Sequence, residues 1–296
     1  MIAWSPCNSI EHSGMASSYY TNHRDKIITD DGLRLFTQSW VPPKAEKHLI
    51  IHHGFGEHSD RYGNVLQVLE DQRIAVYSFD ARGHGRSQGK KGDSPGIFRY
   101  VRDLEQFLLH LKEKWGIRKP FLLGHSMGGL VAASFATTQL NQWEIAGLLL
   151  SAPGLRVTLT PLMQVKKTAG KLLSFMKEDL IMEAGLDENL ISHDEAVRKA
   201  YHSDPLVHGK VSVRMALSLL EAGEEVLRKA GKVRIPVWIG HGSDDGIASP
   251  EGAMEFYERV SSVDRSLQIY EGLYHEIFNE IRPEPLQDLR NWLGKH

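Results

Sequence analysis

The chain has 296 residues, of which 41% are hydrophobic and 24% are charged, a composition typical of a globular protein with one large domain or one domain plus an insertion. Its net charge of −2 lacks the basic excess of nucleic-acid-binding proteins, so no nucleic-acid partner is expected. Cys7 is the single cysteine, which excludes an internal disulfide and is compatible with a reducing compartment. No apolar run approaches the roughly 20 residues that a membrane span needs, and the first 15 residues lack the pattern of a secretion signal.

The arrangement of apolar runs predicts a mostly parallel sheet. Residues 1–24 are interpreted as a flexible extension, and two strand-like runs around Asp30-Asp31-Gly32 then indicate a hairpin. Short, almost continuous apolar runs follow, as expected for parallel strands covered on both faces. These runs are residues 48–53, 73–80, 120–124, 145–152, 235–240 and 266–272. Amphipathic helical segments such as residues 100–116 lie between several of them, so we predict an α/β fold with helices on both faces and an antiparallel edge.

The alternation stops between residues 155 and 234, where the sequence becomes helical and shows no convincing strand. Thr160 and Pro161 are typical of a helix start, and the next residues place apolar side chains on one face and lysines outside it. Two crossover helices of the core are the alternative, but about 80 residues is far more than the dozen or more that a crossover needs. We therefore predict a helical cap at 155–234 on a core formed by 25–154 and 235–296.

A serine in the middle of the chain has the surroundings of a nucleophile. Gly124-His125-Ser126-Met127-Gly128 fits the pattern G-x-S-x-G, with a predicted strand before it and a predicted helix after it. A sharp strand-to-helix turn strains the serine backbone and leaves room only for small residues two positions away, which Gly124 and Gly128 supply. The helix N-terminus would also favour an oxyanion that develops beside the hydroxyl. The alternative is a glycine-rich helix start with an incidental serine.

A serine nucleophile needs a base, and the base needs an acid that fixes its tautomer. In sheets of this kind the two groups follow later strands in the order serine, acid, histidine. Asp244 and Asp245 follow the run 235–240, and His275 follows the run 266–272. The sequence therefore predicts His275 as the base and one of the two aspartates as the acid.

Two competing residues fit this order less well. His241 stands at the end of the earlier strand and would leave no acid between itself and Ser126. Asp204 is a candidate acid, but it lies in the predicted insertion rather than at a strand end.

From Asp25 to the C-terminus the chain resembles serine hydrolases of the α/β-hydrolase superfamily, and within it the monoacylglycerol lipase and bacterial lysophospholipase-like group. The resemblance rests on HHGFGEHSDRY, DARGHGRSQG, GHSMGG, YHSDPLV, GSDDGIASP and YEGLYHEIFNE, in the order of the family. It implies the α/β-hydrolase fold and a triad of Ser126, Asp245 and His275, because the acid of the family is the last residue of a G-[ST]-x-D pattern. The 30 positions from Asp245 to His275 leave room for one helix and one strand.

The resemblance also implies an oxyanion hole and a substrate site. Its donors are the backbone N–H groups of Phe55 and Met127. Glu57, Arg61 and Tyr201 are implied to lie near the alcohol part of the substrate. A carboxylate and a guanidinium together can bind the hydroxyls of a polyol, whereas an unpaired Arg61 would suit a phosphate. A purely structural ion pair between Glu57 and Arg61, four positions apart, is an open alternative.

Other sequence features indicate no cofactor. Gly83, Gly85 and Gly89 imitate a dinucleotide-binding loop, but the last spacing is wrong and no helix is expected to open there, so Asp80 and Arg82 are interpreted as structural. His52, His53 and His58 lack a metal-ligand spacing, and no metal ion is predicted.

One departure from the family concerns substrate choice. Mammalian monoacylglycerol lipases carry a second histidine three residues after the catalytic one, and this chain has Phe278 there.

We therefore predict a serine hydrolase that cleaves the ester of a monoacylglycerol through an acyl-enzyme, with a small lipid ester as its partner. A lysophospholipase or a broad carboxylesterase is the enzymatic alternative, and a ligand-binding member of the fold is the non-enzymatic one. The amphipathic cap is compatible with transient contact with a membrane surface, although a lid that packs only on the core is the simpler interpretation. The expected location is cytoplasmic and at most peripheral to a membrane.

Overall fold

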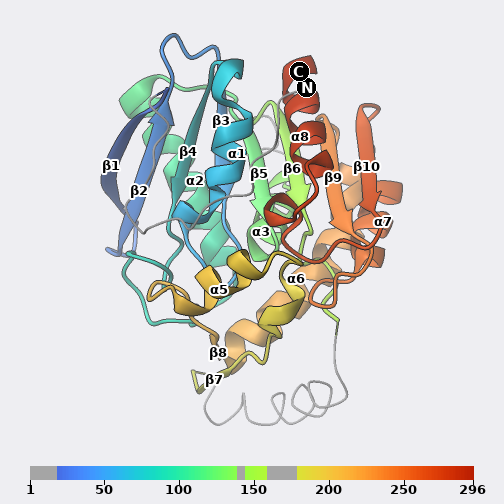
Figure 1. The fold of residues 1–296 in the computed structure, drawn as a ribbon. Coiled ribbons are helices and arrows are strands. Elements are labelled where there is room, and N and C mark those ends of the chain that lie inside the picture. The colour runs from blue at the N-terminus through green and yellow to red at the C-terminus, as the bar shows by residue number, and fades with distance from the viewer. Residues whose placement is uncertain (1–18, 139–143, 159–178) are drawn as a thin grey trace.

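Strands from both ends of the chain form one twisted sheet (Figure 1). The structure, a computed structural model, describes residues 19–138, 144–158 and 179–296. The sheet has the order β1-β2-β4-β3-β5-β6-β9-β10. The strands are β1 (Thr21–Ile28), β2 (Arg34–Val41), β3 (Lys47–His52), β4 (Ile74–Phe79), β5 (Phe121–His125), β6 (Gly147–Ser151), β9 (Val237–Gly242) and β10 (Arg265–Tyr270). Within this sheet only the β1–β2 and β2–β4 pairs are antiparallel, which confirms the predicted parallel sheet with an antiparallel edge.

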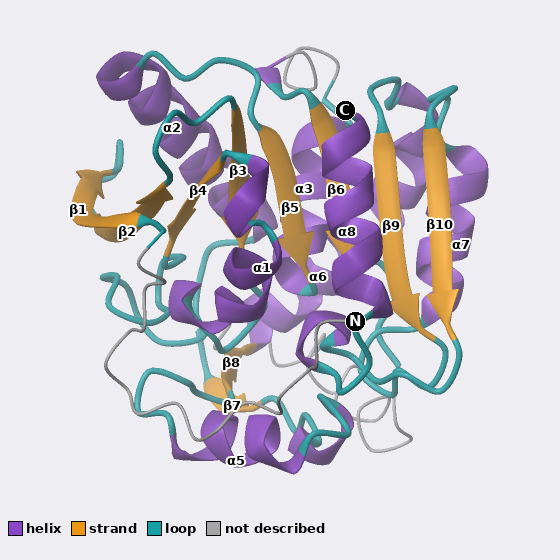
Figure 2. Ribbon diagram, turned by 45° about the horizontal axis from the view of Figure 1, so that its top comes forward, coloured by secondary structure: helices purple, strands orange, loops and turns teal. Residues whose placement is uncertain are grey.

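Helices cover both faces of this sheet, as predicted. One layer consists of α2 (Ile97–Trp115), α3 (Met127–Ala136), α6 (Val213–Lys229) and α7 (Pro250–Arg259), and the other of α1 (Gly63–Val68) and α8 (Glu284–Lys295) (Figure 2). Successive residues of one strand point into different layers: Leu122 packs with the first layer and Leu123 with the second. A strand that is buried on both faces needs apolar residues at every position, which explains the continuous apolar runs.

The first strand begins earlier than the sequence predicted. Thr21 pairs with Val41 and Arg24 pairs with Gln38, so the hairpin includes four residues of the predicted N-terminal extension. These residues form a strand because they pair with β2. Their side chains are mostly exposed, so the sequence shows no alternation of apolar and polar residues that would predict a strand there. The remainder of the predicted extension, residues 1–18, lies outside the described residues.

The segment between β6 and β9 contains both helices and strands. It includes β7 (Ile181–Glu183), α5 (Glu195–Ser203), β8 (Lys210–Ser212) and α6. β7 and β8 pair with each other antiparallel, so the expectation that this segment has no strand is wrong. The helix predicted from Thr160 onwards lies outside the described residues. α5, β7 and β8 lie below the lower end of the sheet in Figure 1, whereas α6 packs beside α3 in the helical layer of the core.

The described helices also bear on membrane insertion. None of those in residues 19–138, 144–158 and 179–296 has the length and hydropathy that spanning a bilayer requires.

Candidate active site

Ser126 stands at the turn between β5 and α3. Its backbone has φ 53° and ψ −117°, a region that non-glycine residues rarely occupy, so the turn is strained. The turn is held by hydrogen bonds from Ser126 N to the Ser151 carbonyl at 3.0 Å and from Gly154 N to the Ser126 carbonyl at 2.9 Å. Met127 is the first residue of α3, and its N–H therefore belongs to the helix end where intrahelical acceptors are lacking.

The two glycines that frame the serine have no space for a side chain. A Cβ on Gly124 would lie 2.3 Å from the Gly128 carbonyl oxygen, and a Cβ on Gly128 would lie 2.1 Å from the His52 carbonyl oxygen. The second contact shows that the turn packs directly against the end of β3. The loop after β3 is thereby placed beside Ser126.

Asp245 and His275 come together at the ends of β9 and β10. His275 Nδ1 lies 2.7 Å from Asp245 Oδ2, and both side chains are buried. Asp245 Oδ1 accepts the N–H groups of Ile247 and Ala248 at 2.8 and 2.9 Å, which fixes the carboxylate. The ring of His275 packs 4.8 Å from that of His125, the residue before Ser126, so the pair lies at the serine turn.

The electrostatics of this pair suit a base that becomes charged. Burial of Asp245 raises its pKa, but the attraction of His275 and the hydrogen bonds of His241 and His275 outweigh burial and hold the pKa below its usual value. Burial of His275 lowers its pKa, but the attraction and hydrogen bond of Asp245 outweigh this and raise the pKa above its ordinary value. Burial lowers the pKa of His125 to about 4, so this neighbouring ring stays neutral.

The competing acids and bases have other positions. Asp244 is exposed and accepts a hydrogen bond from Ser243 Oγ at 2.7 Å. Asp204 lies 2.8 Å from His58 Nε2, away from the Asp245 carboxylate. His241 Nε2 lies 3.0 Å from Asp245 Oδ2, so this histidine supports the same carboxylate that His275 contacts. The order of the residues in the chain argued against His241 as the base, but it did not predict that His241 would hydrogen-bond to Asp245.

The loop after β3 brings Gly54 and Phe55 against the serine. A Cβ on Gly54 would lie 3.2 Å from Ser126 Cβ, so the backbone of this turn passes directly beside the nucleophile. The Phe55 ring packs edge-on against His84 and His208 at 5.6 and 5.9 Å, which fixes the position of this residue in the loop.

The predicted alcohol-binding residues form a buried cluster. Arg61 Nη1 donates to Glu57 Oε2 at 2.8 Å, so the ion pair considered from the sequence is present. The Arg61 guanidinium lies 4.7 Å from the centre of the Tyr201 ring, which comes from α5. Glu276, which directly follows His275, also pairs with Arg61, and sequence reasoning missed it. The only indication in the sequence was that Glu276 directly follows the predicted base, His275.

Phe278 stands three residues after His275, at the position where the resembling mammalian monoacylglycerol lipases carry a second histidine. Its side chain is buried and its ring lies parallel to Trp238 at 6.1 Å. Phe278 also lines a cavity of about 10 Å³ together with Glu57, Arg61 and Glu276, so the wall beside the charged cluster is apolar here.

Asp80 and Arg82 perform structural work. Asp80 Oδ1 accepts hydrogen bonds from the backbone N–H of Ser59 at 2.9 Å and from the Ser59 hydroxyl at 2.6 Å. These bonds connect the loop after β4 to the loop after β3. Arg82 donates twice to Asp103, at 2.6 and 2.7 Å. His53 Nδ1 lies 2.7 Å from the Gly54 carbonyl and its Nε2 accepts the N–H of Ala81, so this histidine is also used by the backbone. Among the described residues, no three His, Cys, Asp or Glu side chains gather as metal ligands would.

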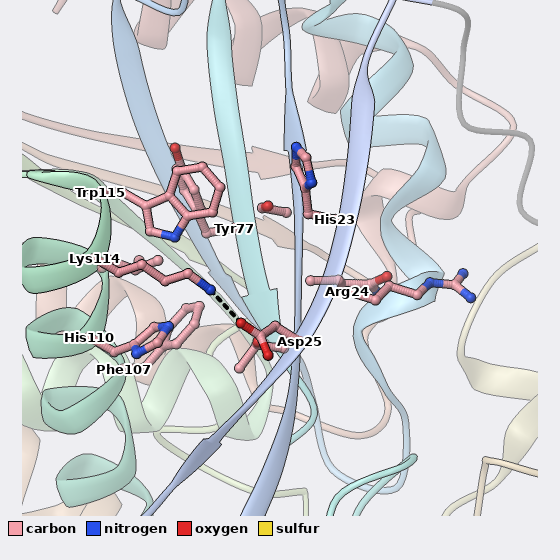
Figure 3. A pocket seen from close by; sticks show the side chains of 12 residues that line it. His23, Arg24, Asp25, Tyr77, Phe107, His110, Lys114 and Trp115 are labelled. Carbon is pink, nitrogen blue, oxygen red and sulfur yellow. Dashed lines mark hydrogen bonds and ion pairs between the residues drawn. The ribbon is translucent and has the colours of Figure 1, made fainter.

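A larger pocket of about 250 Å³ lies at the antiparallel edge of the sheet (Figure 3). Its labelled side chains come from β1, β4 and α2, and an ion pair between Lys114 and Asp25 crosses it. His23 and Trp115 face each other with ring centres 5.8 Å apart. The lining contains none of the residues of the serine turn or of the Asp245–His275 pair, so the chemistry is assigned to the other site.

One known protein family matches most of this chain. Residues 43–282 match the family described as serine aminopeptidase, S33. The chain belongs to this family. A monoacylglycerol lipase of Mycolicibacterium smegmatis is 32% identical over 280 residues, which cover 90% of this chain and 94% of that protein. An uncharacterised abhydrolase domain-containing protein of Dictyostelium discoideum is 33% identical over 268 residues, which cover 89% of this chain but only 28% of that protein.

A solved structure has the same overall fold. A soluble variant of monoglyceride lipase from Saccharomyces cerevisiae, in complex with a substrate analogue, superposes with a TM-score of 0.83 at 26% identity and covers 99% of both chains. The predicted α/β-hydrolase fold and the monoacylglycerol lipase-like group are therefore confirmed. Within the serine aminopeptidase S33 family, this chain is a carboxylic ester hydrolase.

Proposed function

We propose that this enzyme hydrolyses the ester of a monoacylglycerol to a fatty acid and glycerol. The observation that supports this most directly is the Asp245–His275 pair, 2.7 Å apart and packed against the strained turn of Ser126. The 32% identical mycobacterial relative and the similar yeast structure, a monoacylglycerol lipase and a monoglyceride lipase by name, suggest the substrate.

The proposed mechanism forms and breaks an acyl-enzyme. His275 takes the proton of the Ser126 hydroxyl as its oxygen attacks the ester carbonyl, and Asp245 stabilises the imidazolium. The N–H groups of Phe55 and Met127 donate to the oxygen that becomes negative. His275 then gives its proton to the departing alcohol, and a water molecule activated by the same imidazole releases the fatty acid.

Glu57, Arg61 and Tyr201 are proposed to bound the alcohol side of the site. Their support is the buried cluster that they form beside the loop after β3. Residues 155–234 are proposed to act as the cap over the acyl chain. α5 and the β7–β8 pair lie at that end of the sheet, while α6 packs with the core, so the C-terminal limit of the cap remains a prediction. Contact of the cap with a membrane concerns mainly residues outside the described ranges.

Two experiments test the proposal. A fluorophosphonate probe should label the wild-type protein and should not label Ser126→Ala. A panel of monoacylglycerol, diacylglycerol, lysophosphatidylcholine and short p-nitrophenyl esters should show the highest kcat/KM for monoacylglycerol. Labelling without hydrolysis of monoacylglycerol would refute the substrate, and no labelling of folded protein would refute the nucleophile.

A further inference from the structure

Arg61 is held by two carboxylates, and their charges do not balance. Its Nη1 donates to Glu57 Oε2 at 2.8 Å and to Glu276 Oε1 at 2.6 Å, and its Nη2 donates to Glu276 Oε2 at 2.8 Å. The side chains of Arg61, Glu57 and Glu276 are only 11%, 5% and 6% exposed. One positive charge therefore meets two negative charges in a place with little water to screen them.

The other hydrogen bonds of the two carboxylates come from neutral groups. Glu57 Oε1 accepts the Gly54 N–H at 2.5 Å and the Tyr62 hydroxyl at 2.9 Å. Glu276 Oε2 accepts the Asn279 amide at 2.9 Å. These donors satisfy the oxygens but add no positive charge. Burial of Glu57 raises its pKa, but the attraction of Arg61, together with smaller effects that include the Gly54 N–H hydrogen bond, lowers the pKa to about 2, so this carboxylate is ionised at neutral pH.

The charged cluster lies next to the reacting groups. A Cβ on Gly54 would be 2.9 Å from Glu57 Oε1 and 3.2 Å from Ser126 Cβ, so the Glu57 carboxylate and the nucleophile flank the same backbone turn. Glu276 follows His275 directly in the chain. Glu57, Arg61 and Glu276 line one cavity with His125, and the attraction of both glutamates contributes to raising the pKa of His275. The negative charge therefore acts on the proposed base that gives the leaving alcohol its proton.

We propose that Glu276 makes the alcohol side of the active site electronegative, so that the enzyme prefers esters of uncharged or cationic alcohols and rejects esters whose alcohol carries a phosphate. This inference rests on the proposed ester hydrolysis and defines its substrate class. Without Glu276, Arg61 and Glu57 would form a neutral pair. With it, both terminal nitrogens of the guanidinium, Nη1 and Nη2, donate to carboxylates, and the Tyr201 ring lies against the guanidinium face.

A phosphate would meet two obstacles at this site. It would have to displace a bidentate carboxylate from Arg61, and charge-assisted bidentate pairs are among the strongest hydrogen bonds in proteins. A phosphate that stayed outside would face one uncompensated negative charge, and at a separation of about 10 Å this lowers kcat/KM by about tenfold.

The first test uses the wild-type enzyme and three esters with the same octanoyl chain, all below their micellar concentrations. The alcohols are glycerol, glycerol 3-phosphate and choline. We expect kcat/KM for the phosphate ester to be at least about tenfold below that for the glycerol ester, and the choline ester to equal or exceed the glycerol ester. Equal rates for the glycerol and phosphate esters would overturn the inference alone. Hydrolysis of none of the three would overturn the proposed function and this inference with it.

The second test removes the charge while keeping the shape. Glu276→Gln should raise the ratio of phosphate-ester to glycerol-ester kcat/KM by about tenfold and reduce the advantage of the choline ester by a similar factor. Glu284→Gln is the matched control, because it removes one carboxylate charge from an exposed position at the start of α8 and should change neither ratio. A parallel fall for all three esters would mean that Glu276 only supports the fold and would overturn the inference. If Glu276→Gln does not fold, the wild-type ranking decides.

Discussion

His241 and His275 donate hydrogen bonds to the same oxygen of Asp245. His275 Nδ1 lies 2.7 Å and His241 Nε2 lies 3.0 Å from Asp245 Oδ2. An ionised carboxylate only accepts hydrogen bonds, so each of these nitrogens carries its proton. The His241 proton is shared with the Ala248 carbonyl, also at 3.0 Å. The carboxylate that orients the base is therefore itself held by a second, buried imidazole.

Removing this second donor should change the pH dependence of catalysis. In His241→Leu the Asp245 carboxylate loses a hydrogen bond, becomes more basic and stabilises the charged form of His275 more strongly. We expect the acid limb of the kcat/KM profile to move to higher pH and kcat at pH 7 to fall by about tenfold. Profiles between pH 5 and 9 measure this. His241→Gln keeps a donor and should shift the limb less, and an unchanged limb in His241→Leu would contradict the role.

Removing the charge of Asp245 should move the acid limb of the pH profile to lower pH, opposite to the effect of His241→Leu. His275 works as a base only when neutral, and Asp245 raises its pKa, so wild-type activity should fall as the pH drops through a value above the ordinary 6.5. Asp245→Asn removes this attraction and leaves burial, which lowers the pKa of His275. We expect kcat to drop by about 10⁴ and the remaining activity to persist to lower pH. Asp244→Asn, at the exposed neighbouring position, should leave both kcat and the profile unchanged.

Folding of the serine turn depends on the absence of a side chain at Gly128. An alanine there would place its Cβ 2.1 Å from the His52 carbonyl oxygen, so β3 and the turn must move apart. We expect Gly128→Ala to lower the free energy of unfolding by about 1–3 kcal/mol and kcat/KM by about 10²-fold, because the loop after β3 would shift with the strand. Chemical denaturation and steady-state kinetics measure the two effects. Gly63→Ala in α1 has open space around its Cβ and should be neutral or stabilising.

The parallel strands were predictable because each one carries a complete local signal. β5 and β6 are buried on both faces, so each is a continuous apolar run that predicts a strand without knowledge of its neighbours. Short strands lack such a signal. β7 has three residues and exists through its pairing with β8, where Ile181 opposes Ser212. No window of sequence around Ile181 contains its partner, so a reading by periodicity passes over it.

The candidate site was predictable to the extent that chain order reflects strand order. Ser126, Asp245 and His275 each follow a strand of one sheet, and parallel strands bring their carboxyl ends to the same edge. Glu276 and His241 were missed because their roles depend on partners. Glu276 meets Arg61 across 215 positions of the chain, and only the folded structure shows that this arginine has a second carboxylate partner besides Glu57.

The Arg82–Asp103 pair should be important for stability and unimportant for chemistry. Arg82 is 5% exposed and Asp103 is fully buried, and the two share hydrogen bonds of 2.6 and 2.7 Å. Arg82→Met would leave the carboxylate without its charge partner, and burial already raises the pKa of Asp103. We expect a loss of about 3–5 kcal/mol in the free energy of unfolding, with kcat of the folded enzyme unchanged within about threefold.

The double variant Arg82→Met/Asp103→Leu should recover most of this loss, because an apolar pair leaves no buried charge. Lys229→Met is the control for an ordinary ion pair: Lys229 and Glu225 are exposed neighbours on α6, and the change should cost less than about 1 kcal/mol. Urea denaturation of the four proteins measures these differences. A large fall in kcat for Arg82→Met at a temperature where it is fully folded would show that the loop after β4 participates in catalysis, contrary to the structural role proposed for it.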